Sequence, residues 1–367
     1  MAKYFQFISD ELHPMHIILR ITIATVFSIW GMILRFKTLA NRELWLDEIN
    51  QLSLTLEPLK PLWLRDYPRK DITSFPGDYL LTYPFVKLFG ASKLVAIPHA
   101  IVTMLGFYLL YVICRRYFMT TIGYLVAFPL MCFHGQLIWH ALEIRPYAVL
   151  PTLALACFYF GKHVIGKPDR DNTHILTKCA VGLLLVITIL FHAFGIYIVS
   201  FVLLFHMLNH SKEESFLDVI RRNAKFLSTI AAIVLLPWIW FTAGILSIPH
   251  KEFNVFAYIP NPLSDLYGFS TAIVGNLLGF RRLYFLLLFG MLAAFIIPHQ
   301  ERYPQIKFFL TLIVFPVLCI LISAMITNYW FLPRQFVWVM PLFCFFLGWC
   351  WDSVIHSFSE KIASSNR

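Results

Sequence analysis

The sequence predicts an all-α membrane protein, a polytopic bundle of about ten (ten to twelve) transmembrane helices. Of its 367 residues, 59% are hydrophobic and only 14% are charged, whereas soluble domains are typically about 45–50% apolar and about 25% charged. The excess runs along the whole chain, in stretches that approach the ~20 residues a helix needs to cross a bilayer. This pattern excludes a secreted or cytosolic soluble enzyme, a disordered scaffold and a barrel of alternating strands.

Ten apolar stretches are predicted to span the membrane, although several are shorter than a full crossing. They are Ile17–Phe36, Leu94–Cys114, Ile122–Trp139, Tyr147–Ile165, Ile175–Phe191, Ile196–Leu208, Phe226–Leu246, Leu283–Pro298, Ile306–Ile326 and Phe336–Trp351. Two further pieces, Tyr79–Phe89 and Leu263–Phe280, are short or interrupted by glycine, so we expect interfacial or re-entrant helices there. Residues 1–367 are therefore expected to form one integral membrane domain.

The basic residues predict the orientation of the chain in the membrane. The formal net charge is +10, and most cations outside the long first loop fall in segments that are cytoplasmic if the N-terminus is cytoplasmic. This is the positive-inside bias of membrane proteins, so no nucleic-acid partner is expected. The first outside loop, residues 37–93, carries an acidic motif and the predicted juxtamembrane helices. We expect a bacterial plasma (inner) membrane, with this loop on the periplasmic or extracellular face.

The first outside loop contains an acidic pair, Asp47 and Glu48, inside the apolar segment Leu44–Ile49. A carboxylate held at the membrane boundary can act as a base between a lipid substrate and a water-borne one. Adjacent residues on a helix point about 100° apart, so only one of the two is expected to face a substrate. The sequence favours Asp47 as the base, with Glu48 orienting or completing the site. The alternative is the solvated face of an interfacial helix.

The shorter outside turns carry further ionisable groups, namely His140, Glu143, Arg145, His192 and Arg334. Pro146 suits the first turn of a helix, so Arg145 is expected at a helix start, where a phosphate binds well. Arg334 occupies a similar place before the last span. The alternatives for Arg145 are a structural pair with Glu143 or an anchor to lipid headgroups. For Arg334, too, the alternative is a structural or anchoring role.

His192 lies in a predicted tight turn between two apolar runs, in the segment Phe191–Gly195. It is either a turn residue with local hydrogen bonds or a contact to the transferred group. His140 and Glu143 are further candidates for substrate contacts. With the acidic pair, His192 could form a divalent-metal site, although nothing in the spacing demands one. The sequence thus leaves a divalent metal open and indicates no other cofactor.

These residues suit the transfer of a sugar from a polyprenyl phosphate to an acceptor hydroxyl. Asp47 would take the acceptor proton, while Arg145 and Arg334 would stabilise the charge that grows on the departing lipid phosphate. The anomeric carbon becomes oxocarbenium-like, as in glycoside hydrolysis, and a single displacement inverts it. No glycine-rich nucleotide loop is present or needed.

At this point the sequence resembles the C-type (GT-C fold) membrane glycosyltransferases. It is most similar to the family-39-like group of dolichyl-phosphate-mannose protein mannosyltransferases and lipid A aminoarabinose transferases. Six segments follow the order of that family, from the acidic motif to an Arg-Pro ending: 44–48, 79–90, 115–118, 143–148, 191–195 and 333–341. The resemblance implies an acidic residue near the acceptor, at Asp47 or Glu48, and basic residues near the lipid phosphate, at Arg145 and Arg334.

The chain departs from that family in two places. Where the family often has His-Pro-Pro, this sequence has Ser74–Asp78, so a role of that histidine is either missing or moved to Asp78. The extra outside domain of larger relatives is also missing. A glycolipid or growing glycan is therefore a more plausible acceptor than a folded protein. The competing functions are a transporter or lipid-linked sugar flippase, and a membrane scaffold whose acidic loop binds a partner.

Overall fold

The structure is a computed structural model, and it describes most of the chain. The described residues are 14–56, 76–165, 173–210, 215–246, 302–327 and 333–365, with short pieces at 265, 267–268, 271–272, 275 and 289–292. Within these ranges every regular element is a helix, and no β-strand occurs. The predicted all-α class is therefore confirmed for this part of the chain.

The described helices divide into those of the bundle and those that lie at its ends or interrupt it. The bundle helices are α2 (Pro14–Asn41), α6 (Ile97–Tyr117), α7 (Ile122–Phe133), α9 (Leu150–Ile165), α10 (Thr173–Phe191), α11 (Gly195–His210), α12 (Phe216–Leu246), α16 (Phe315–Thr327) and α17 (Val339–Ser365). The others are α3 (Leu46–Leu56), α5 (Pro76–Phe89), η1 (Lys93–Ala96), α8 (Gly135–His140), η2 (Pro146–Ala148), α15 (Arg302–Phe309), η3 (Leu310–Val314) and η4 (Pro333–Phe336).

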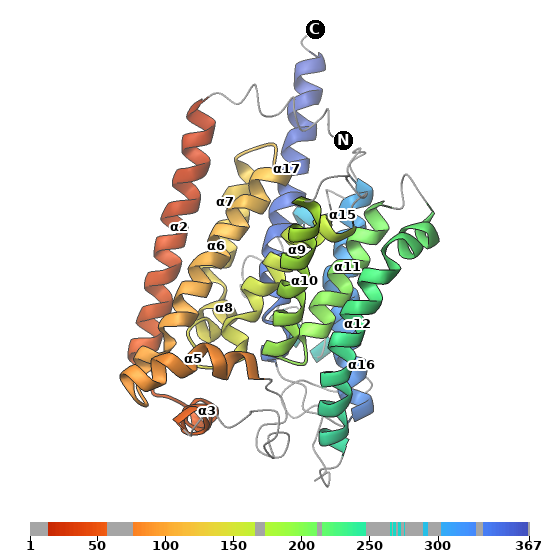
Figure 1. The fold of residues 1–367 in the computed structure, drawn as a ribbon. Helices are drawn as coiled ribbons and strands as arrows, with labels where there is room; N and C mark the ends of the chain where they lie inside the picture. Colours follow the sequence, from red (N-terminus) through yellow and green to blue (C-terminus); the bar gives the residue numbers. More distant parts are fainter. Residues whose placement is uncertain are drawn as a thin grey trace.

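The bundle helices run roughly alongside one another, whereas α3 and α5 lie across one end of the bundle (Figure 1). The end of α2, the turn between α10 and α11 and the start of α17 lie toward the same end as α3 and α5. The crosswise α5 coincides with the interfacial helix predicted at Tyr79–Phe89. The alternation of helix directions therefore collects several segments that are far apart in sequence at one end of the molecule.

An aromatic core lies between α9, α15, α17 and the turn that connects α6 to α7. Phe118 stacks on Phe345 with ring centroids 5.4 Å apart, and Phe308 meets Phe158 edge to face at 5.2 Å. Helices α7 and α17 approach so closely that a Cβ atom added to Gly348 would lie 2.7 Å from the carbonyl oxygen of Gly123. Small residues at such a contact let two helix backbones approach each other, as membrane helices commonly do.

The outer surface of the bundle is apolar, as a bilayer requires. Large aliphatic side chains such as Ile18 on α2, Ile101 on α6 and Leu183 on α10 are more than half exposed. Four described helical segments are long and apolar enough to cross a membrane: Met15–Asn41, Lys93–Tyr117, Tyr303–Ile322 and Val339–Glu360. The fold and composition thus define an all-helical membrane protein, whereas the number of ten spans stays a prediction.

Most predicted stretches coincide with helices, and one of them is broken. The sequence predicts a single span over Ile122–Trp139, but α7 ends at Phe133 and α8 begins at Gly135, because the extended backbone of His134 interrupts the helix. Arg35, buried on α2, donates to the carbonyl oxygens of Met131 (2.9 Å) and Cys132 (3.2 Å). It thereby satisfies carbonyls that the broken helix leaves without helical partners.

Two predicted segments cannot be compared with the structure. Only residues 289–292 of the expected span Leu283–Pro298 are described, and they are helical. The expected interfacial segment Leu263–Phe280 is described only at residues 265, 267–268, 271–272 and 275, and residues 57–75 of the first outside loop lie outside the described part.

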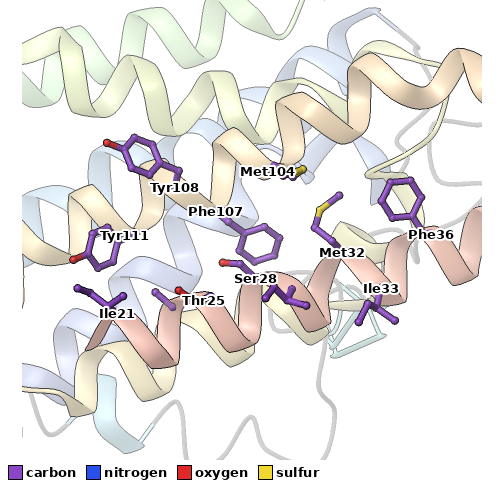
Figure 2. Close-up of a pocket in the computed structure, with 12 residues that line it drawn as sticks. Ile21, Thr25, Ser28, Met32, Ile33, Phe36, Met104, Phe107, Tyr108 and Tyr111 are labelled. Atoms are coloured by element: carbon purple, nitrogen blue, oxygen red, sulfur yellow. The ribbon is translucent and has the colours of Figure 1, made fainter. Parts of the chain in front are cut away.

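A groove of about 660 Å³ lies between α2 and α6 (Figure 2). It runs from Ile21 and Tyr111 at one end to Phe36 at the other, and its lining is almost entirely apolar. None of the ionisable residues singled out from the sequence lines it.

The end of the bundle away from α3 and α5 is held by a charged clamp. The Asp352 carboxylate on α17 accepts hydrogen bonds from the backbone N–H groups of Met119 and Thr120, both at 2.7 Å, and from the Thr120 hydroxyl at 2.6 Å. Arg20 on α2 donates to the Met119 carbonyl oxygen at 2.6 Å. The turn between α6 and α7 is thus attached to the first and the last helix.

Candidate active site

An ion pair between Asp47 and Arg334 joins two segments that are 287 residues apart in sequence. Asp47 lies in the first turn of α3, and Arg334 lies in the short helix η4, just before α17. The distance from Arg334 Nη1 to Asp47 Oδ2 is 3.1 Å, and the two side chains are 18% and 30% exposed. Because both are reachable from solvent, this pair is accessible to a ligand.

Two aromatic rings pack against the Arg334 guanidinium. Its central carbon lies 5.0 Å from the centroid of the Trp45 ring and 5.3 Å from that of Tyr147. Tyr147 in turn packs on the His192 ring, with centroids 5.1 Å apart. Contacts between a cation and an aromatic face are attractive and restrict the long arginine side chain. The structure therefore brings Asp47, Arg334 and His192 into one cluster through Trp45 and Tyr147.

The electrostatic surroundings keep Arg334 charged. Burial by itself lowers the pKa of its guanidinium, but Tyr147, Asp47 and Glu143 outweigh this effect, and the pKa is raised above its ordinary value. Arg145 acts in the opposite direction as a second nearby cation. Glu143 and Arg145 thus belong to the same electrostatic environment, and we call Trp45, Asp47, Glu143, Arg145, Tyr147, His192 and Arg334 the Asp47–Arg334 cluster.

Glu48 does not face the solvent with Asp47 but points into the protein. Its carboxylate is fully buried and accepts hydrogen bonds from Arg42 at 2.5 and 2.8 Å, from the Trp45 N–H at 3.2 Å and from the Ile144 N–H at 2.9 Å. This arrangement raises the pKa of Arg42, chiefly through the side-chain hydrogen bond with Glu48. Of the two roles expected for Glu48, the geometry fits orientation of the site, not contact with a substrate.

Glu143, a member of the cluster, forms a buried pair with His140. The His140 Nδ1 atom lies 2.6 Å from Glu143 Oε2, and its Nε2 atom lies 3.1 Å from Gln136 Oε1. The other Glu143 oxygen, Oε1, is buried without a hydrogen-bond partner among the described residues. A buried carboxylate oxygen of this kind is available to a substrate hydroxyl or a water molecule.

Arg145 precedes a proline as expected, but the helix it opens differs from the expected one. Pro146 begins the short 3-10 turn η2, and the α-helix α9 starts only at Leu150. Arg145 itself is 4% exposed and has an extended backbone. The helix start predicted after Arg145 is therefore a single 3-10 turn and not the start of α9.

His192 lies in the predicted tight turn between α10 and α11. Its Nδ1 atom accepts a hydrogen bond from the Phe194 N–H at 3.1 Å, and its carbonyl oxygen accepts one from Gly195 at 2.8 Å. Glycine is needed at 195 because an added Cβ atom would collide with the Thr188 carbonyl oxygen. His192 thus both forms the hydrogen bonds of this turn and packs its ring against Tyr147.

Asp78 belongs to a different group of residues. It is fully buried at the start of α5, where its carboxylate pairs with His99 Nε2 at 2.9 Å and accepts a hydrogen bond from Gln51. Gln51 lies on α3 and His99 on α6, so this group attaches the helix that carries Asp47 to the bundle. Its contacts fit a structural role better than the substrate contact suggested by the sequence.

Three residues of this region had no role assigned from the sequence. Trp45 and Tyr147 make cation–ring contacts with Arg334, and Arg42 donates hydrogen bonds to Glu48. The only sequence signal was their position beside the motifs, since Trp45 is two residues before Asp47 and Tyr147 is two after Arg145. Their partners come from segments far away in the chain, which hydrophobic periodicity does not reveal.

The described residues contain no group of three or more His, Cys, Asp or Glu side chains placed to hold a metal ion. In comparisons with protein-family models, with curated proteins and with solved structures, nothing matches this chain. Its function is therefore argued from the geometry of the Asp47–Arg334 cluster.

Proposed function

We propose that the protein is a membrane glycosyltransferase that moves a sugar from a polyprenyl-phosphate donor to an acceptor hydroxyl. The observation that carries this proposal is the ion pair between Asp47 and Arg334, with Arg145 and Glu143 beside it, at one end of an apolar bundle. A carboxylate and guanidinium groups in one place are what the reaction needs. The carboxylate takes a proton, and the guanidinium groups stabilise a phosphate.

In the proposed reaction, the Asp47 carboxylate accepts the proton of the acceptor hydroxyl. The acceptor oxygen bonds to the anomeric carbon as the bond from that carbon to the phosphate oxygen breaks. The electron pair of the broken bond stays on the polyprenyl phosphate. This is a single displacement, so the anomeric configuration inverts. Arg334 and Arg145 stabilise the charge gained by the phosphate, the part of the reaction where electrostatic help lowers the barrier most.

The membrane location suits a donor with a long isoprenoid chain. An isoprenoid tail requires an apolar surface, and the groove between α2 and α6 offers one whose Phe36 end lies toward the C-terminal end of α2, which Arg42 follows directly. The acceptor in this proposal is a glycolipid or growing glycan. The site faces the non-cytoplasmic side, in the periplasmic or extracellular space of a bacterial plasma membrane.

Replacing Asp47 tests this function directly. We expect Asp47→Asn to lower turnover by about 10²–10⁴-fold, the usual contribution of a general base, while the protein still inserts and folds. The measurement is glycosylated product formed by purified protein in nanodiscs with polyprenyl-phosphate sugars and lipid or glycan acceptors. Glu43→Gln is the matched control, because Glu43 is an exposed carboxylate of the neighbouring turn and lies outside the cluster.

The same assay separates the competing functions. A flippase moves labelled lipid across the bilayer without forming a glycosylated product, and a scaffold is insensitive to Asp47→Asn. Product that forms equally well with Asp47→Asn would remove Asp47 from the mechanism. Absence of product with every polyprenyl-phosphate sugar tested would contradict the proposed function.

A further inference from the structure

The two residues to which the proposed function gives opposite tasks are bonded to each other. Asp47, the base, lies 3.1 Å from Arg334, which binds the phosphate. The Nη1 donor of Arg334 is occupied by Asp47, and its guanidinium carbon lies 5.0 and 5.3 Å from the ring centroids of Trp45 and Tyr147. In this state the carboxylate and the Nη1 group have each other as partners, so neither is free for its task.

The charges of the cluster point the same way. Asp47 and Glu143 are formally balanced by Arg145 and Arg334, and the neighbouring Glu48 is balanced by Arg42. A balanced site exerts little net attraction on an anion. If Asp47 leaves Arg334, or loses its charge by taking up a proton, the balance becomes positive. The cluster then attracts a phosphate.

We propose that Arg334 is a shared cation that exchanges Asp47 for the lipid phosphate during the reaction. This inference rests on the proposed function and concerns the regulation of the same site. The incoming donor phosphate competes with Asp47 for Arg334, so donor binding frees the carboxylate that serves as the base. Without donor, the base stays paired, and an acceptor or water molecule is not activated.

The exchange is completed by the chemical step itself. As Asp47 takes the acceptor proton it becomes neutral, and its attraction to Arg334 falls. In the same step the phosphate oxygen gains the electron pair of the broken bond, which strengthens its attraction to Arg334. When the proton leaves for solvent, Asp47 becomes an anion again. It then competes with the polyprenyl phosphate product for Arg334 and promotes product release.

Binding of the product, polyprenyl phosphate, to purified protein in nanodiscs tests the exchange without needing catalysis. We expect Asp47→Asn to bind it about tenfold more tightly than wild type, equal to about 1.4 kcal/mol. Glu43→Gln removes an exposed carboxylate nearby and is expected to leave the affinity unchanged. In an Arg334→Gln background, Asp47→Asn is expected to add nothing, because the cation for which both groups compete is gone.

Two results of this cycle would overturn the exchange. One is an unchanged or weaker affinity for Asp47→Asn in the wild-type background. The other is an equal gain with and without Arg334, which would mean general repulsion between Asp47 and the anion. If Arg334→Gln does not fold, carbodiimide labelling of Asp47 in the wild-type protein replaces it. Labelling is expected to increase when polyprenyl phosphate is added, and an unchanged or decreased labelling contradicts the exchange.

The binding experiment also distinguishes this inference from the function on which it rests. Tight binding of polyprenyl phosphate with no effect of Asp47→Asn leaves the glycosyltransferase standing and removes the exchange. No binding to the wild type or to Asp47→Asn removes the donor class, and the exchange with it.

Discussion

Arg334 illustrates how a single side chain can be oriented by contacts of different kinds. Its Nη1 atom bonds to the Asp47 carboxylate, while its central carbon lies over the rings of Trp45 and Tyr147. A guanidinium suits this environment because it is planar, with donors at its edge and two faces that stack on rings. A lysine at 334 would keep the charge but lose both the planar stacking and the fork of donors.

The ring of Tyr147 is expected to matter more than its hydroxyl. Tyr147→Leu removes the contacts with Arg334 and His192, so we expect the KM for the polyprenyl-phosphate donor to rise about tenfold, in line with the usual strength of a cation–π contact. Tyr147→Phe keeps the ring and is expected to stay within about twofold of wild type. Steady-state kinetics of the two variants provide the measurement, and equal behaviour of the two would contradict a role for the ring.

Glu48 is expected to contribute to stability more than to the chemistry. Glu48→Gln leaves the partly exposed Arg42 guanidinium without its charged partner, and losing a hydrogen bond to a charged group usually costs about 1.5–3 kcal/mol. We therefore expect a clear loss in thermal unfolding temperature in detergent, whereas the exposed Glu43→Gln has almost none. A Glu48→Gln protein with normal stability and no turnover would instead place Glu48 in contact with substrate.

At the scale of elements, α3 is held in place at two points along its length. Glu48 in its first turn bonds to the backbone of Ile144, and Gln51 one turn later bonds to Asp78 on α5. Asp47 directly precedes Glu48 in this first turn and pairs with Arg334. Two buried attachments on one short helix fix its rotation, so the acidic residue that is left exposed is determined by its neighbours.

Close contact between α7 and α17 provides a second element-level test. Gly348→Leu would bring side-chain atoms against Gly123 and Ala127 on α7, and overpacking of this kind usually costs about 1–3 kcal/mol. We expect lower thermal stability in detergent. Gly135→Ala is the matched control, because a Cβ atom at 135 meets nothing within 4 Å. Equal stability of both variants would contradict tight packing at this contact.

At the scale of the whole molecule, the two ends of the bundle are organised for different purposes. The end with α3 and α5 carries the Asp47–Arg334 cluster, while the other carries the clamp formed by Asp352 and Arg20 (Figure 1). Residues of the clamp bond to backbone groups of one turn. A clamp of this kind stabilises the connection of helices without exposing reactive groups.

The clamp is expected to affect stability without affecting substrate binding. Asp352→Asn replaces an acceptor oxygen by an amide donor beside the N–H groups of Met119 and Thr120, and such buried losses cost about 1–3 kcal/mol. We expect a lower unfolding temperature and an unchanged KM for the donor. Differential scanning fluorimetry and steady-state kinetics measure the two quantities, and a changed KM would show that the two ends are coupled.

The sequence by itself determined the helical membrane class and most helix positions. A composition that is 59% hydrophobic and grouped in runs leaves few alternatives to helices in a bilayer, because every backbone group there must find a partner within the protein. Turn residues such as Gly195 and Pro146 were also readable, since their backbone requirements are local. The break between α7 and α8 could not be read from the sequence, because a carbonyl group at the break is satisfied by Arg35 of another helix.

Only the tertiary structure decided which charged residues meet. The sequence placed Asp47, Arg145 and Arg334 at helix ends and favoured Asp47 over Glu48 as the base, but it could not show that Asp47 pairs with Arg334 while Glu48 is buried against Arg42. It also grouped Asp78 with the site, although that residue pairs with His99 and Gln51. Residue spacing encodes which face of a helix a side chain occupies. What lies opposite that face follows from how the helices pack.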